Sequence, residues 1–122
     1  MPINRIRQIL NLRERSVAFF TRGQKFIAHP NNTGSTGAWL LSSKKVRNGF
    51  YLGITVVVYL RLVTENAIWR GKCSGVIALP PDPKGRTRYR LNLVNLNQVD
   101  TANTNWFDCT QTRRQDFTYF NC

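Results

Sequence analysis

The chain has 122 residues, 42% of them hydrophobic, which suits one folded domain with a modest core. Eighteen lysines and arginines stand against six aspartates and glutamates, a net charge of +12, so nucleic acid is the first partner to expect. No apolar run is long enough to span a membrane, and three cysteines with a single histidine disfavour a structural zinc site. We expect no metal, no cofactor, and reduced thiols in a cytoplasmic or nucleoid-associated protein.

The first segment, residues 1–15, has the pattern of an amphipathic helix. Ile3, Ile6 and Ile9 recur at three-residue spacing, and Pro2 suits a first helical turn. The intervening arginines are then left on the solvent side. A packing helix with a basic edge is the simplest interpretation. Phosphate contact from that edge, or an organellar targeting segment, are the alternatives.

Two short apolar segments follow, at residues 16–20 and 25–28. They predict two strands, either separate or paired as one hairpin across a turn at 21–24. The next segment, 29–37, is dense in Asn, Gly, Ser and Thr and predicts a loop. It begins with His29, for which the sequence offers no nucleophile and no orienting acid. A structural or ligand-contacting role is therefore expected rather than catalysis.

A polar, lysine-rich loop is predicted before the most apolar part of the chain. Lys44, Lys45 and Arg47 stand close to two hydroxyl residues, Ser42 and Ser43. Cations beside hydroxyls are groups that contact phosphate. The segment is therefore a candidate phosphate site, with a solvated loop as the alternative.

Residues 54–63 and 67–79 are the stretch around which the rest of the chain is organised. Both are apolar, and the turn formers at 64–66 between them predict a β-hairpin. The first run is too apolar for a surface strand, so we place it centrally with both faces covered. Gly71 and Gly75 weaken the second run unless a bulge or a close approach needs them.

Residues 80–85 must turn, and residues 86–96 then resume as a strand. Arg86, Arg88 and Arg90 alternate there with apolar residues, so all three are expected on one face of the strand. This row predicts a nucleic-acid surface, with a merely solvated face as the alternative. The alternation slips after residue 92, which predicts a bulge or the end of the strand.

The tail, residues 98–122, is polar with aromatic islands, and the last island, 117–120, predicts an edge strand that closes the sheet or barrel. No phosphate-binding glycine loop is present, and the six acidic residues are scattered, whereas a two-metal nuclease needs converging carboxylates. An enzyme is therefore not expected. A small RNase-like or toxin-like activity that uses His29 is the alternative.

Six motifs follow one another between residues 24 and 97. They are Phe26-Ile27-Ala28-His29-Pro30, Trp39, Lys44-Lys45-Val46-Arg47-Asn48-Gly49, Val56-Val57-Val58-Tyr59-Leu60, Ala67-Ile68-Trp69-Arg70-Gly71-Lys72-Cys73 and Leu79-Pro80-Pro81-Asp82. In this order they resemble the EVE domain, a member of the PUA-like superfamily that also includes YTH and ASCH domains. The resemblance implies an α+β fold, a small mixed β-barrel with an N-terminal helix and short flanking helices. One domain would span 1–122, with a barrel core at 16–97 and a closing segment at 98–122.

Relatives in that superfamily bind nucleic acid and often hold a modified or flipped base in an aromatic pocket. The corresponding residues here would be Trp39, Tyr59 and Trp69 as pocket walls, with Ser42, Ser43 and His29 as polar groups. The first hypothesis is thus a reader of modified or flipped bases in DNA or RNA, acting within a nucleoprotein or restriction assembly. The second is a structural, ribosome-associated RNA-binding protein without a pocket.

Overall fold

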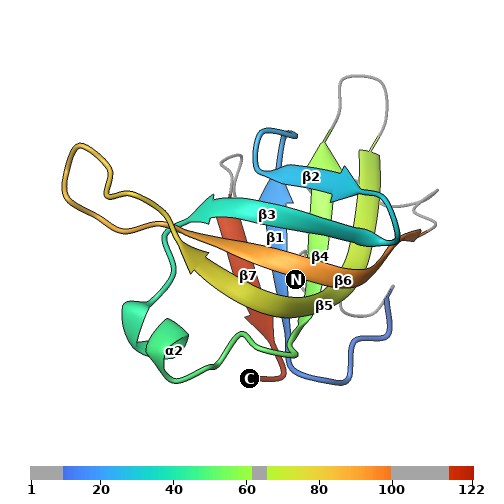
Figure 1. Ribbon diagram of the computed structural model, residues 1–122. Helices are drawn as coiled ribbons and strands as arrows, with labels where there is room; N and C mark the ends of the chain where they lie inside the picture. Colours follow the sequence, from blue (N-terminus) through green and yellow to red (C-terminus); the bar gives the residue numbers. More distant parts are fainter. Residues whose placement is uncertain (1–9, 62–65, 100–115) are drawn as a thin grey trace.

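The computed structural model describes residues 10–61, 66–99 and 116–122. Within these ranges the chain forms one mixed sheet of seven strands with one short helix beside it (Figure 1). In chain order the elements are β1 (Ser16–Thr21), β2 (Phe26–His29), β3 (Thr33–Trp39), α2 (Ser43–Arg47), β4 (Thr55–Arg61), β5 (Asn66–Ala78), β6 (Tyr89–Val99) and β7 (Asp116–Phe120).

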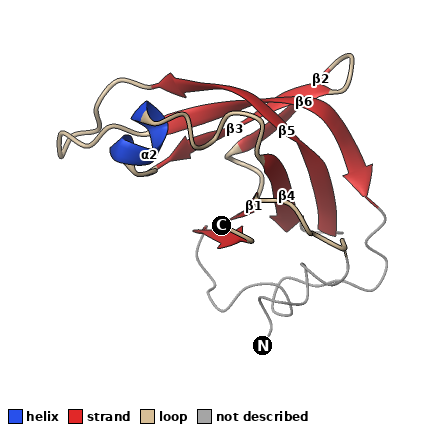
Figure 2. Ribbon diagram, turned by 90° about the horizontal axis from the view of Figure 1, so that it is seen from below, coloured by secondary structure: helices blue, strands red, loops and turns tan. Residues whose placement is uncertain are grey.

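The sheet runs in the order β2-β3-β6-β5-β4-β1-β7 and curls around its own core (Figures 1 and 2). Only the β1–β4 pair is parallel, and the other pairs are antiparallel. The two edge strands, β2 and β7, are not paired with each other, so the barrel is not closed. The fold prediction is confirmed in its β-rich, mixed-sheet character, and the closed barrel is wrong.

The predicted central hairpin is confirmed as the antiparallel pair of β4 and β5. Strand β4 is buried on both faces because its alternate side chains enter two different clusters. Val56 and Val58 belong to the main core inside the curled sheet, whereas Val57 and Tyr59 belong to a smaller outer cluster. This explains why the strand reads as a continuous apolar run.

Residues 10–15 are turn and irregular chain, so they do not continue the predicted N-terminal helix; residues 1–9 lie outside the described part. Leu10 and Leu12 nevertheless pack into the outer cluster over β1 and β4. In the described ranges no helix has the length and apolar character needed to cross a membrane.

The loop predicted at residues 29–37 is wrong, because Thr33–Trp39 is strand β3, paired with both β2 and β6. The turn is shorter and centres on Asn31 and Asn32, whose φ angles are 64° and 56°. Small residues suit this strand, since a Cβ at Gly34 would lie 2.6 Å from the carbonyl oxygen of Ile27. Pairing with distant strands therefore overrides the local turn preference.

The irregularities predicted in the second half of the hairpin are confirmed. The β5–β6 register shifts between Arg70 and Lys72 and again between Cys73 and Gly75. A Cβ at Gly71 would lie 2.9 Å from the Val94 carbonyl oxygen, so glycine is needed there for close approach.

Strand β1 pairs with β4 and β7, and β2 pairs with β3, so β1 and β2 are separate strands and not one hairpin. Strand β7 is an edge strand beside β1, as the aromatic island at 117–120 predicted. Its side chains Phe117 and Tyr119 pack against the main core.

Candidate nucleic-acid interface

The lysine-rich segment is a short helix, α2, and not the predicted loop. Ser42 caps it, because the Ser42 hydroxyl accepts a hydrogen bond from the Lys45 backbone N–H at 3.3 Å. None of the five helical residues is buried. Lys44 and Arg47 are exposed, and Lys45 is half-buried, so the helix presents its cations at the surface.

The predicted row of three arginines is only partly correct. Strand β6 begins at Tyr89, so Arg90 alone lies in it, exposed, while Arg86 and Arg88 lie in the loop before it. Both loop arginines face Asp82: the Nε–Oδ2 distances are 2.9 Å for Arg86 and 3.7 Å for Arg88. Hydrogen bonds from Arg86 hold the pKa of Asp82 below its usual range. Because Asp82 in the 80–85 turn holds both arginines, the strand begins three residues later than predicted.

Tertiary structure brings the two basic segments to the same end of the sheet. In Figures 1 and 2 helix α2 and the loop between β5 and β6 lie at one end of the strands. The Ser43 and Tyr89 hydroxyls are 2.9 Å apart and join α2 to the start of β6. Lys25 lies there too: burial, and then the charge of Arg88, lower its pKa.

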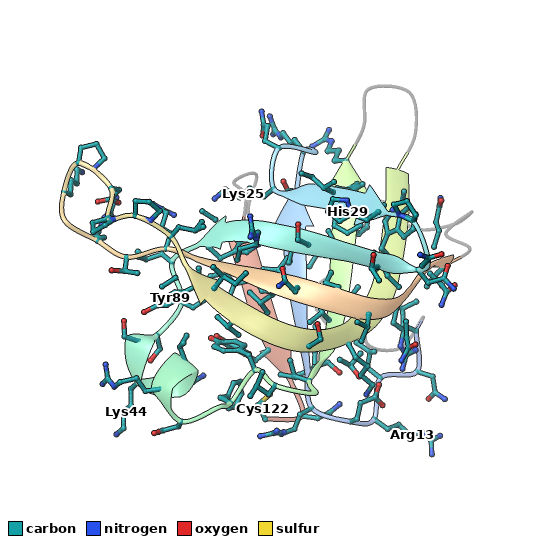
Figure 3. The ribbon with its side chains drawn as sticks, viewed as in Figure 1. Arg13, Lys25, His29, Lys44, Tyr89 and Cys122 are labelled. Atoms are coloured by element: carbon teal, nitrogen blue, oxygen red, sulfur yellow. The ribbon has the colours of Figure 1, made fainter. Side chains whose placement is uncertain are left out.

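We call this region the basic end. It comprises Lys25, Lys44, Lys45, Arg47, Lys84, Arg86 and Arg88. In Figure 3 the labelled Lys44 stands at the α2 corner, far across the view from Arg13.

Aromatic rings lie directly under some of these cations, a feature that the sequence analysis missed. The Lys45 Nζ is 4.0 Å from the ring centre of Tyr119 and 4.7 Å from that of Phe50. The Arg15 Cζ is 5.1 Å from the centre of the same Phe50 ring. These distances are typical of cation–π contacts. The available signal was Phe50-Tyr51, directly after the basic segment.

The aromatic cluster consists of Phe50, Tyr51, Phe117 and Tyr119. The Tyr51 and Tyr119 hydroxyls are 2.5 Å apart and join the turn after α2 to the edge strand β7. Burial, and then this hydrogen bond, raise the pKa of Tyr51 far above its ordinary value. Tyr51 is therefore a fixed core residue, whereas Phe50, Phe117 and Tyr119 are half-buried.

The three aromatic residues expected to wall a base pocket are not brought together. Trp39 is 2% exposed in the main core, 4.8 Å from the Phe19 ring centre, and its Nε1 donates to the Thr36 hydroxyl at 2.8 Å. Tyr59 is fully buried in the outer cluster, on the other face of the sheet. Trp69 is half-buried against Phe26. Trp39 and Trp69 both pack on the main core, where they are buried or half-buried among apolar side chains, and strand alternation sends only Tyr59 to the opposite face.

The three polar residues assigned to that pocket are also apart. Ser42 caps α2 and Ser43 bonds Tyr89, both at the basic end. His29 is exposed at the end of β2, in a groove that Arg90 also lines. No carboxylate and no second histidine lines this groove, so it offers no general-base pair for the RNase alternative.

Two cavities lie on the outer side of the sheet. The first, of about 520 Å³, is lined by Glu14, Thr55, Arg70, Gly71, Lys72, Asn95, Asn97 and Val99. The second, of about 480 Å³, is the groove lined by Ile27, His29, Thr33, Gly34, Ser35, Ser74, Arg90, Asn92, Leu93 and Val94. No Phe, Tyr or Trp side chain lines either one, and the only ring is the His29 imidazole in the second, so neither has a pair of facing rings between which a base would stack.

Four of the polar residues that line the first cavity are already joined to one another. Arg70 pairs with Glu14 at 2.7 Å, Thr55 donates to the same carboxylate at 3.0 Å, and Lys72 donates to Thr55 at 2.8 Å. A hydrogen bond from its own backbone, and then those from Arg70 and Thr55, lower the pKa of Glu14 to about 2. The network is an ion-pair bridge between the segment before β1 and strand β5.

Among the described residues no three His, Cys, Asp or Glu side chains gather where they would hold a metal ion. Comparisons of the chain with family models, with curated proteins and with solved structures gave no match. The site is therefore interpreted from its own geometry and charge.

Proposed function

We propose that the protein binds nucleic acid, with its basic end on the phosphate backbone. The observation that supports this most strongly is the convergence of two basic segments, 44–47 and 84–88, at one end of the sheet. Clustered cations that reach the phosphates supply most of the affinity of a sequence-independent nucleic-acid contact.

The charge balance at the surface supports the same proposal. Two carboxylate side chains that the structure describes, Glu14 and Asp82, already pair with arginine. Asp82 offsets part of the charge of Arg86 and Arg88, while no acidic residue lies in α2. None of the described ion pairs involves a cation of the helix, so α2 is expected to contribute most to binding.

A matched pair of charge-removing variants tests the proposal. Lys44→Ala removes one exposed cation from the basic end, and Arg13→Ala removes one exposed cation on the far side of the molecule (Figure 3). If the basic end holds phosphates, Lys44→Ala weakens binding to labelled duplex DNA or RNA about 3- to 10-fold at low salt, whereas Arg13→Ala changes it less than 2-fold. Equal losses in the two variants would show that only net charge matters.

Reading of a modified or flipped base needs rings that enclose the base, and no Phe, Tyr or Trp side chain lines either of the two cavities described above. The proposal is therefore nucleic-acid binding without a base pocket, a feature that it shares with the second hypothesis, the structural, ribosome-associated RNA-binding protein. Membership of the PUA-like superfamily stays part of the proposal, and the mixed sheet that curls around the main core supports it. A binding panel of modified and unmodified oligonucleotides is expected to show no preference beyond about 2-fold; a strong preference would restore the base-reader hypothesis.

A further inference from the structure

The aromatic cluster under Lys45 has a composition that phosphate binding alone does not need. A duplex backbone is held by cations and hydrogen-bond donors, and its bases are already stacked on each other. Half-buried rings beside cations are instead the combination found where single strands bind, because exposed bases stack on aromatic faces. Phe50 and Tyr119 both lie directly beneath the Lys45 ammonium group.

We propose that Phe50 and Tyr119 form a stacking surface for unpaired bases, so that the ligand of the basic end is single-stranded nucleic acid. This rests on the proposed function, because the neighbouring cations must hold the phosphates. In the free protein Lys45 and Arg15 cover the rings. On binding, their charged groups turn to the phosphates, and bases take their places on the ring faces.

The relative strengths of the two contacts favour this exchange. An exposed cation–π contact changes an equilibrium about 2- to 5-fold. Stacking of one base on an aromatic ring changes affinity about 5- to 150-fold. The displaced lysine also gains a phosphate contact instead of losing a partner. Lys45 is long and only half-buried, so it moves without disturbing the core.

Contacts with the core hold the Phe50 and Tyr119 rings in place, and this prepares them for stacking. Tyr119 is held by the hydroxyl contact with Tyr51, which is fully buried. Phe50 packs edge-on against both Tyr51 and Tyr119, at interplanar angles of 85° and 83°. A rigid aromatic surface loses little entropy when a base binds to it.

The test compares a single-stranded 12-mer with the duplex of the same sequence, by fluorescence anisotropy at fixed salt. Wild-type protein is expected to bind the single strand about 10-fold more tightly. Phe50→Leu keeps an apolar side chain but removes the ring, and should lower single-strand affinity at least 5-fold with duplex affinity unchanged. Phe50→Tyr keeps the ring and should retain the preference, as should Leu52→Ala in the same turn, whose side chain is 55% exposed.

A crosslinking experiment on the wild-type chain covers the case in which Phe50→Leu fails to fold. An oligonucleotide with iodouridine, irradiated in the complex, should attach to Phe50 or Tyr119, as read by peptide mass spectrometry. Attachment only elsewhere overturns the inference, as does a Phe50→Leu variant with full single-strand affinity. Salt-sensitive binding with no single-strand preference also overturns it but leaves the proposed function standing. No binding to either oligonucleotide refutes both.

Discussion

Replacing Trp39 by alanine shows whether this residue stabilises the core or binds a ligand. The family resemblance implied that Trp39 is a wall of a base pocket, but the structure packs its ring against Phe19 and Phe117, at centroid distances of 4.8 and 6.0 Å. Lys25 Nζ covers the ring from outside, 4.4 Å from its centre. The substitution is therefore expected to act on folding and not on base preference.

The magnitude follows from these contacts. Truncation of a buried tryptophan to alanine costs about 3–5 kcal/mol of the free energy of unfolding. Loss of the Lys25 contact adds about 0.5–1 kcal/mol. The Thr36 hydroxyl keeps its bond to the Lys25 carbonyl oxygen at 2.6 Å, so no buried polar group is left without a partner. The free energy of unfolding of a whole domain is about 5–15 kcal/mol, so the variant should still fold but with low stability.

Thermal unfolding followed by far-UV circular dichroism is the assay. Trp39→Ala should lower the Tm by about 10–20 °C. Leu40→Ala, at the neighbouring residue with a 42% exposed side chain, should shift it by less than about 2 °C. An unchanged Tm in Trp39→Ala, together with an altered preference among modified oligonucleotides, would refute the core assignment.

Three further predictions concern the scaffold. Gly71→Ala should lower the free energy of unfolding, measured in urea, by about 1–3 kcal/mol, because the added Cβ would lie 2.9 Å from a backbone carbonyl oxygen. Gly75→Ala should be tolerated, since the nearest atom to its Cβ would be 4.0 Å away, and equal effects of the two variants would contradict the bulge geometry. Because folding lowers the pKa of Glu14 to about 2, its stabilisation is present above pH 4.5 and is lost as the pH falls towards 2. Glu14→Gln should therefore be less stable than wild type at pH 7 by about 0.5–1 kcal/mol, since the pair is over a third exposed, and the gap should close by pH 2; a gap that does not change with pH would exclude the carboxylate as its source. Cys73 is buried with a raised pKa, so Ellman's reagent should reach it only on unfolding, and rapid native labelling in peptide mass spectra would contradict its burial.

The sequence was sufficient for elements whose local pattern agrees with their environment. The β4–β5 hairpin, β1 and β7 follow from apolar runs and turn residues, and the glycines of β5 indicated the irregular pairing of β5 with β6. Strand β3 was missed because Gly34 and its polar neighbours prefer turns locally, and only pairing with β2 and β6 makes them a strand. Long-range pairing of this kind leaves little local signal.

The candidate site was predicted in its charges and missed in its aromatic part. Lys44, Lys45 and Arg47 are conspicuous in sequence because they lie within four consecutive residues. The contact of Tyr51 with Tyr119 joins residues 68 positions apart, and no local periodicity indicates it. The tryptophans attracted attention as rare, large residues, yet Trp39 serves the core, where most large aromatic residues contribute their energy.

The salt dependence of binding tests the central proposal most directly. If the basic end neutralises about five phosphates of a duplex, log affinity should fall against log salt with a slope of about −4.5. Removing the three cations of α2 in a Lys44→Ala, Lys45→Ala, Arg47→Ala variant should reduce that slope to about −2, because each lost phosphate contact removes about 0.9. A wild-type slope near zero, or a triple variant with the wild-type slope, would contradict nucleic-acid binding through the basic end.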